Sequence, residues 1–204
     1  MTSTPTAHDD LSFLRQLAER GSNAPLTAGP YLIAGGSWFS LASLLQWPVL
    51  RDALGLGATQ ALLAYLVAAI GSGVHVALLI RRDRGSVETT RNRAVNSVWS
   101  AVGFGIFAFW LGVAAMSWQS RDVFVMNTIL LQVMSVYGIG WSVAAAMARE
   151  RWMGFVAIGA FATVPLMGLV IGTGHAYLIY ALALVLWALI PGLRLSRAAR
   201  QPHG

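Results

Sequence analysis

Polar side chains recur at helical spacing on two long apolar segments of the chain. On residues 59–80, one face of a helix would carry Gln60, Ala64, Gly71 and His75. On residues 123–147, one face would carry Thr128, Gln132, Ser135 and Ser142. If the two helices faced each other, these stripes would form a polar seam able to pass water or a small solute. The alternative is close packing with interhelical hydrogen bonds of about 0.6 kcal/mol each, which the Gly and Ala residues on these faces favour.

Ionisable side chains of Asp, Glu and Arg are absent from the cores of the apolar segments, and the chain has neither lysine nor cysteine. Proton-coupled transport usually needs a titratable acid, and a retinal Schiff base needs a lysine. His75 and His175 fall at opposite membrane depths, so we do not expect them to share a haem or a metal ion. Without a nucleophile–base pair, a metal cluster or a nucleotide loop, we predict a protein that is not an enzyme and has no cofactor.

Six apolar segments must position these polar residues. Hydrophobic residues make up 56% of the 204 residues and charged residues 11%, whereas soluble domains carry roughly one quarter charged residues. Each segment approaches the ~20 residues that a membrane-crossing helix needs, and none alternates with the period of a strand. The predicted spans are residues 31–50, 59–80, 94–118, 123–147, 152–171 and 175–193. We therefore predict an all-α polytopic membrane protein whose six transmembrane helices form three consecutive hairpins.

The arginines are distributed unevenly over the connections between these spans. Twelve of the 14 basic residues lie on the N-terminal arm, the second and fourth connections and the tail. The twelve are Arg15, Arg20, Arg81, Arg82, Arg84, Arg91, Arg93, Arg149, Arg151, Arg194, Arg197 and Arg200. The first and third connections hold only Arg51 and Arg121. Because arginine-rich connections stay in the cytoplasm, the pattern predicts a multi-pass protein of the inner (plasma) membrane with both termini cytoplasmic.

The second connection, RRDRGSVETTRNR, is the most basic part of the chain. Its five arginines could bind a phosphate group or a nucleic acid. It lacks the glycine spacing of a nucleotide loop and the aromatic residues that stack on bases. We therefore expect a topology determinant that contacts anionic lipid headgroups and no nucleic acid. The candidate headgroup contacts are Arg81, Arg82, Arg84, Arg91 and Arg93.

The chain divides into a cytoplasmic arm (residues 1–27), a transmembrane bundle (28–193) and a basic tail (194–204). Within the arm, apolar side chains recur on one side of a short amphipathic helix, opposite Arg15 and Glu19. These apolar residues are Leu11, Phe13, Leu14, Leu17 and Ala18. The helix could pack on the membrane face, or residues 8–20 could dock a cytoplasmic protein.

Three shorter features carry local expectations. The outer turns both place Arg-Asp after a tryptophan, as in Trp118 followed by Arg121 and Asp122, and each Asp is expected to cap the next helix. Pro165 should kink the fifth span, and the Thr163 hydroxyl could bond a carbonyl that the proline frees. Gly168 and Gly172 are expected to form a small-residue packing face on the same helix.

The segments DDLSFLRQLAERGSNAPL, GPYLIAGGSWF and YLIYALALVLWALIPGL resemble small bacterial six-helix inner-membrane proteins. This resemblance implies a bacterial inner membrane and six spans, and it implies no functional residues. Two hypotheses follow from the residues. The first is a non-enzymatic membrane protein that senses, anchors or regulates through its arm and basic loop. The alternative is a small-solute channel or facilitator that uses the polar seam as a homo-oligomer.

Overall fold

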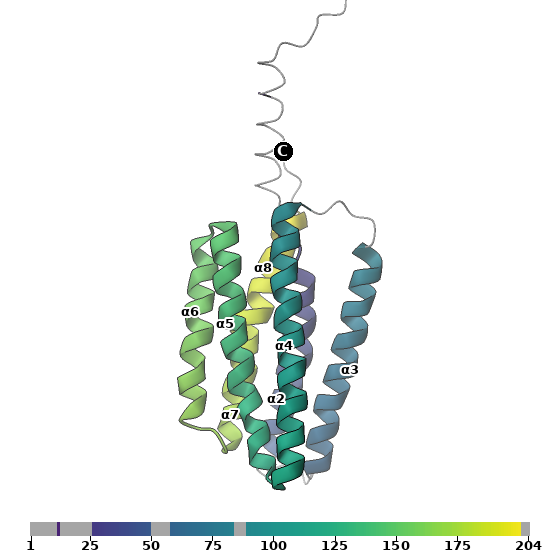
Figure 1. Ribbon diagram of the computed structural model, residues 1–204, viewed down its shortest axis with the longest axis vertical. Helices are drawn as coiled ribbons and strands as arrows, with labels where there is room; N and C mark the ends of the chain where they lie inside the picture. The colour runs from purple at the N-terminus through teal and green to yellow at the C-terminus, as the bar shows by residue number, and fades with distance from the viewer. Residues whose placement is uncertain (1–11, 13–25, 50–57, 84–88, 201–204) are drawn as a thin grey trace, which may run out of the picture.

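The computed structural model describes residues 12, 26–49, 58–83 and 89–200, and only the backbone of residues 58–62 and 123. All the regular elements described are helical (Figure 1). They are α2 (Gly29–Val49), α3 (Ala58–Asp83), α4 (Thr90–Ser120), the 3-10 helix η1 (Val123–Asn127), α5 (Thr128–Ala148), α6 (Arg151–Gly168), α7 (Gly174–Leu184), the π-helix η2 (Val185–Leu189) and α8 (Ile190–Arg200). The predicted N-terminal arm lies outside the described residues, apart from Ser12, Leu26 and Thr27.

Five segments of the described chain are long and apolar enough to cross a membrane. They comprise α3, α4, α5, α6 and the continuous helix α7–η2–α8. The remaining helix, α2, has 21 residues but carries Ser37, Ser40, Ser43 and Gln46. Each of the three serine hydroxyls donates to a carbonyl oxygen three or four residues earlier in α2. These bonds satisfy the hydroxyls without a partner helix, so α2 can lie among apolar neighbours.

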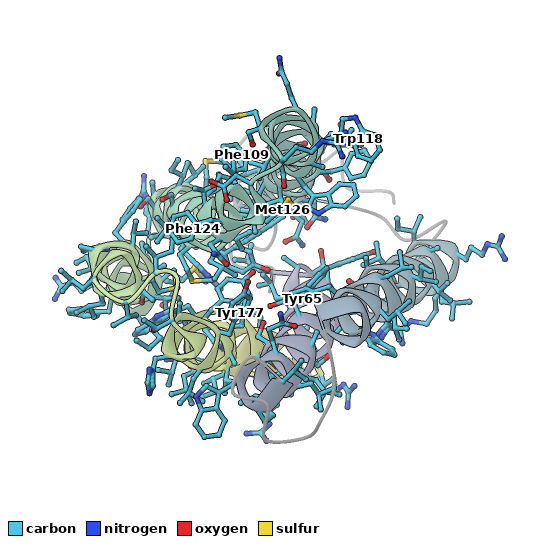
Figure 2. The ribbon with its side chains drawn as sticks, turned by 90° about the horizontal axis from the view of Figure 1, so that it is seen from below. Tyr65, Phe109, Trp118, Phe124, Met126 and Tyr177 are labelled. Carbon is cyan, nitrogen blue, oxygen red and sulfur yellow. The ribbon has the colours of Figure 1, made fainter. Side chains whose placement is uncertain are left out.

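The helices form two layers (Figures 1 and 2). One layer consists of α4, α5 and α6, in which α5 packs against both neighbours. The other consists of α3, α2 and α7–η2–α8, in which α2 packs against both neighbours. Consecutive helices α2 and α3 pack together, as do α4 and α5, whereas α6 packs mainly on α5 and the last helix packs mainly on α2.

Glycines allow α2 to approach the last helix closely. A Cβ atom at Gly36 would lie 3.1 Å from the Leu189 nitrogen. A Cβ atom at Gly29 would lie 2.7 Å from the carbonyl oxygen of Gly192. Such spacing leaves no room for a side chain, so the two backbones touch, as small residues allow in membrane bundles.

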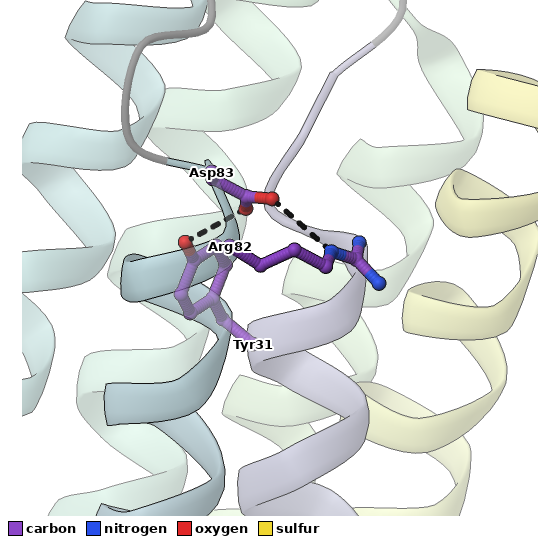
Figure 3. Close-up of polar contacts among 3 residues, drawn as sticks. All are labelled: Tyr31, Arg82 and Asp83. Atoms are coloured by element: carbon purple, nitrogen blue, oxygen red, sulfur yellow. Dashed lines mark hydrogen bonds and ion pairs between the residues drawn. The ribbon is translucent and has the colours of Figure 1, made fainter.

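Helix α3 is the most peripheral of the helices. Its Ala68, Ser72 and Leu79 are buried, but none of its described side chains belongs to the main hydrophobic cluster, which draws on α2 and on α4 to α8. It packs on α2, and at the upper end of Figure 1 its last residue, Asp83, accepts a hydrogen bond from the Tyr31 hydroxyl (3.1 Å). The same carboxylate pairs with Arg82 Nε at 3.5 Å (Figure 3). Helices α3 and α4 follow each other in the chain but are not among the pairs that pack closely.

Two local expectations are corrected and one is confirmed. Helix α6 ends at Gly168, and Gly172 lies in the following turn with φ +86° against Phe124, so the two glycines do not share a helical face. The Thr163 hydroxyl donates to the Gly159 carbonyl (2.8 Å), whereas Pro165 frees the carbonyl four residues before it, that of Phe161. The capping role of Asp122 is confirmed, because its carboxylate accepts from the Phe124 N–H at 2.8 Å. Asp52 lies outside the described residues.

Candidate functional site

The two polar stripes point in different directions. The stripe on α3 faces α2, because Gly71 lies against the ring of Trp38. A Cβ atom placed on Gly71 would lie 2.8 Å from that ring. His75 is half-buried on this helix, and the side chain of Gln60 lies outside the described part. Helices α3 and α5 are not among the closely packed pairs. The structure therefore does not bring the two stripes together as a seam.

The stripe on α5 lies opposite the core. At 100° per residue, Gln132 and Ser142 share the face of Ile139, which is 52% exposed, and Tyr137 and Trp141 occupy the opposite face. The three hydroxyls of the stripe each donate to a carbonyl of their own helix or of η1. These bonds are Thr128 to Val125, Ser135 to Leu131 and Ser142 to Gly138. The hydroxyls of this stripe are therefore satisfied locally, whereas Gln132 Oε1 is buried without a hydrogen-bond partner among the described residues.

A different set of residues meets inside the bundle. Four of the five tyrosines converge between the two layers, from α3, α5 and α7. This tyrosine cluster consists of Tyr65, Tyr137, Tyr177 and Tyr180. The rings of Tyr65 and Tyr177 meet edge to face with centroids 6.3 Å apart (Figure 2). Tyr180 of α7 and Tyr137 of α5 are both buried, with exposed fractions of 4% and 9%.

The directions of the hydrogen bonds in this cluster can be deduced. Ser43 donates its single hydroxyl hydrogen to the Phe39 carbonyl at 2.7 Å. Tyr65, whose hydroxyl lies 2.7 Å from Ser43 Oγ, must therefore be the donor of that bond. Tyr177 donates to Asn127 Oδ1, also at 2.7 Å. Both tyrosine oxygens keep lone pairs that can accept a further hydrogen bond.

Gln46 contributes an unsatisfied acceptor one helical turn from Ser43. Its side chain is 9% exposed, and its Oε1 has no hydrogen-bond partner among the described residues. Gln46 lies one helical turn below Ser43, on the face of α2 that also carries Gly35. A Cβ atom placed on Gly35 would lie 3.6 Å from the Tyr137 hydroxyl. This face therefore looks into the interior. A buried carbonyl without a partner costs about 1–3 kcal/mol. Gln132 Oε1 on α5 is buried without a hydrogen-bond partner in the same way.

Tryptophans fill the upper half of the interior. This tryptophan cluster consists of Trp99, Trp141, Trp152 and Trp187. The centroids of Trp99 and Trp141 lie 5.2 Å apart, and those of Trp141 and Trp152 lie 5.8 Å apart. Arg194 stacks over the outer ring, Trp152, at 4.3 Å. The Tyr137 ring lies 5.5 Å from Trp99 and joins the two clusters.

The π-helix η2 holds the tryptophan cluster in place. The Trp187 carbonyl cannot accept a helical bond from residue 191, because Pro191 has no N–H. Trp141 Nε1 donates to that carbonyl at 2.7 Å instead. Trp187 Nε1 in turn donates to the Thr163 hydroxyl at 3.0 Å, and its ring lies where a side chain at Gly159 would stand. Proline and the π-turn thus create an acceptor that α5 uses to hold the last helix.

The basic residues gather at the upper end. Arg81, Arg82 and Arg93 are exposed there, as headgroup contacts require. Arg91 is half-buried and donates to the carbonyl of Ala148, the last residue of α5, at 3.3 Å. It therefore ties α4 to the end of α5, a structural role that the sequence does not predict. Arg84 lies outside the described residues.

Sequence reasoning did not identify the tyrosine cluster, because its members lie on three helices with no shared spacing. The one available signal was the polarity of residues 31–50, where Ser43 and Gln46 interrupt an apolar segment. Among the residues that the structure describes, no group of His, Asp or Glu side chains could hold a metal ion. No protein-family model, no curated protein and no solved structure matches this chain.

Proposed function

We propose that this protein is a non-enzymatic integral membrane protein that binds a small neutral solute in the tyrosine cluster and senses its presence. The observation that carries the proposal is the buried Gln46 Oε1 atom, which has no hydrogen-bond partner among the described residues and lies one helical turn from Ser43, the acceptor of the Tyr65 hydroxyl. A solute that donates a hydrogen bond would recover the cost of that unpaired acceptor. The buried polar residues include none with a charge, which favours a neutral solute.

Binding is favoured over conduction because polar groups line only the lower part of the interior, whereas tryptophan rings fill the upper part. Polar groups extend from Tyr177 at the lower end to Tyr137 at the middle of α5. Above Tyr137 the interior is filled by Trp99 and by Trp141, which is fully buried. A small-solute channel is the second candidate, since the hydroxyls reach halfway through the bundle, but it would need the tryptophan cluster to move.

The proposed orientation places the upper end in the cytoplasm of a bacterium and the lower end outside its inner membrane. Exposed arginines gather at the upper end, where they can contact anionic headgroups. We propose that the arm (residues 1–27) and the basic connection relay the bound state there. Because the chain has no cysteine, a membrane-impermeant maleimide can test the orientation in intact cells. Gln119→Cys should be labelled and Ala199→Cys should not, and the reverse result would invert the topology.

A swelling assay separates binding from conduction. Proteoliposomes are mixed with hyperosmotic glycerol or urea, and solute entry is followed by light scattering. We expect entry no faster than in protein-free liposomes. Entry that is accelerated by the protein and slowed by Gln46→Leu, but not by Gln132→Leu, would overturn the sensing proposal in favour of a channel. Gln132 is a suitable control because its Oε1 is likewise buried and unpartnered but lies on the face of α5 opposite Tyr137.

A further inference from the structure

We propose that the outer face of α8 binds one anionic phospholipid, with its phosphate on Arg194 and Arg197 and its acyl chains on Ile190 and Leu193. This inference concerns the upper end of the bundle and does not depend on the solute proposed for the tyrosine cluster. Three observations carry it. They are a groove on α8, the order of apolar and basic side chains along that groove, and the contact that fixes Arg194.

The groove runs along one side of α8. Its volume is about 560 Å³, and it is lined by Ile190, Leu193, Arg194, Arg197 and Ala198. The spacing of three, four, seven and eight residues from the first of these places all five on one face of a helix. Gly192 and Ser196 lie on the opposite side, where Gly29 of α2 packs against them. The groove therefore faces away from α2, and it belongs to a helix that is long and apolar enough to cross a membrane.

The side chains along the groove change from apolar to basic toward the end of the helix. Ile190 and Leu193 are 51% and 38% exposed, and the exposed Arg194 and Arg197 follow them toward the upper end. At 1.5 Å per residue, Arg197 lies about 10 Å beyond Ile190. A phospholipid has the same order, because its phosphate lies at the membrane surface and its chains lie below. A free phosphate ion would use only the arginines and leave the apolar half of the groove empty.

Arg194 is held in place by an aromatic ring. Its Cζ atom lies 4.3 Å from the ring centroid of Trp152, and Trp152 packs in turn on the buried Trp141, with ring centroids 5.8 Å apart. A guanidinium over a ring keeps N–H groups at its edge, where they can donate in pairs to phosphate oxygens. No carboxylate among the described residues pairs with Arg194 or Arg197. The groove thus presents a positioned and unneutralised positive charge directly beside an apolar surface, which is the complement of an anionic lipid.

Native mass spectrometry of the purified protein in detergent tests this inference with two lipids of equal chain length. Phosphatidylglycerol carries a net negative charge, whereas phosphatidylcholine carries the same phosphate beside a cationic group. We expect one phosphatidylglycerol molecule to bind about tenfold more tightly than phosphatidylcholine, as one charge-assisted hydrogen bond predicts. Arg194→Gln combined with Arg197→Gln should remove this preference. The matched control is Arg81→Gln combined with Arg93→Gln, which removes the same charge from exposed arginines of α3 and α4 and should keep the preference.

Three other outcomes would overturn the inference. Equal binding of the two lipids would show that the groove does not recognise an anionic lipid. An equal loss of preference in both double variants would show a general attraction to the positive end of the bundle and no site on α8. The deacylated headgroup, glycerophosphoglycerol, separates a lipid from a soluble phosphate compound. We expect it not to displace phosphatidylglycerol at equal concentration, and displacement would show that the acyl chains make no contact with the groove. The lipid comparison and the displacement use the unaltered protein, so they decide the matter even if circular dichroism shows that a double variant does not fold.

Discussion

In the tryptophan cluster, Trp141 and Trp187 each donate the indole N–H to an acceptor within the protein, at 2.7 and 3.0 Å. In the tyrosine cluster, Tyr137 and Tyr180 donate to no described residue, and Gln46 Oε1 accepts from none. Both clusters lie between the same two layers. The indole donors of the upper cluster are therefore satisfied within the protein, whereas these polar groups of the lower half have no hydrogen-bond partner among the described residues.

The difference has a physical basis in how each half is packed. The upper half is built on α5, α6 and the last helix, and Trp141 has no exposed surface. The lower half is bordered by α3, which gives no described side chain to the main hydrophobic cluster. In a bilayer, lipid is as apolar as a protein core, so a helix such as α3 gains little by packing more tightly.

The largest effect should come from Trp141→Phe in the tryptophan cluster. The substitution removes the donor to the Trp187 carbonyl and leaves a smaller ring in a fully buried position. Because Pro191 supplies no N–H, that carbonyl could not regain an ordinary α-helical bond. We expect a loss of about 3 kcal/mol in the free energy of unfolding, measured in mixed detergent and SDS micelles by the loss of helicity. Tyr137→Phe is the matched control in the other cluster and should cost under about 0.5 kcal/mol, since its hydroxyl has no partner to lose.

A smaller effect is expected from Gly159→Ala. The new Cβ would lie 2.4 Å from the ring of Trp187, which is held by its bond to Thr163 and cannot swing away. We expect a loss of about 2 kcal/mol by overpacking, measured in the same way. Gly138→Ala is the control, because its Cβ would meet the ring of Phe161, which is 41% exposed and free to move. Equal losses at the two glycines would show that Trp187 is not fixed.

The positions of the helices could be predicted from the sequence because hydrophobic length and arginine placement decide them. The predicted span 59–80 and α3 (Ala58–Asp83) agree closely, as do residues 31–50 and α2 (Gly29–Val49). The count of six spans stays a prediction, since five segments meet the criterion of length and apolarity. The arrangement as three hairpins stays a prediction too, because α6 packs mainly on α5 and the last helix mainly on α2.

The candidate site could not be predicted, because side-chain partners in a membrane bundle depend on packing that apolar patterns do not encode. The stripe with Gln132 and Ser142 is regular in sequence but faces away from the core. The tyrosines have no common period, and only the fold brings Tyr65 of α3 beside Tyr177 of α7. Pro191 signals a helix interruption, but nothing in the sequence shows that Trp141 uses the acceptor it frees.

The smallest change in the free energy of unfolding is expected for Gln46→Leu. Unlike the other substitutions, it should not lower that free energy. Leucine has nearly the same volume as glutamine and removes a buried carbonyl that has no partner among the described residues. If the lower half is built for a ligand and not for stability, the variant should unfold with a free energy unchanged or raised by about 1 kcal/mol in the absence of solute. The measurement is the same unfolding in SDS, with Ser43→Ala as the comparison. Ser43→Ala should cost about 1 kcal/mol, because it deprives the Tyr65 hydroxyl of its acceptor. A loss at Gln46→Leu as large as that at Ser43→Ala would mean that Gln46 contributes to the fold, and the contrast between the two clusters would fail at its most informative residue.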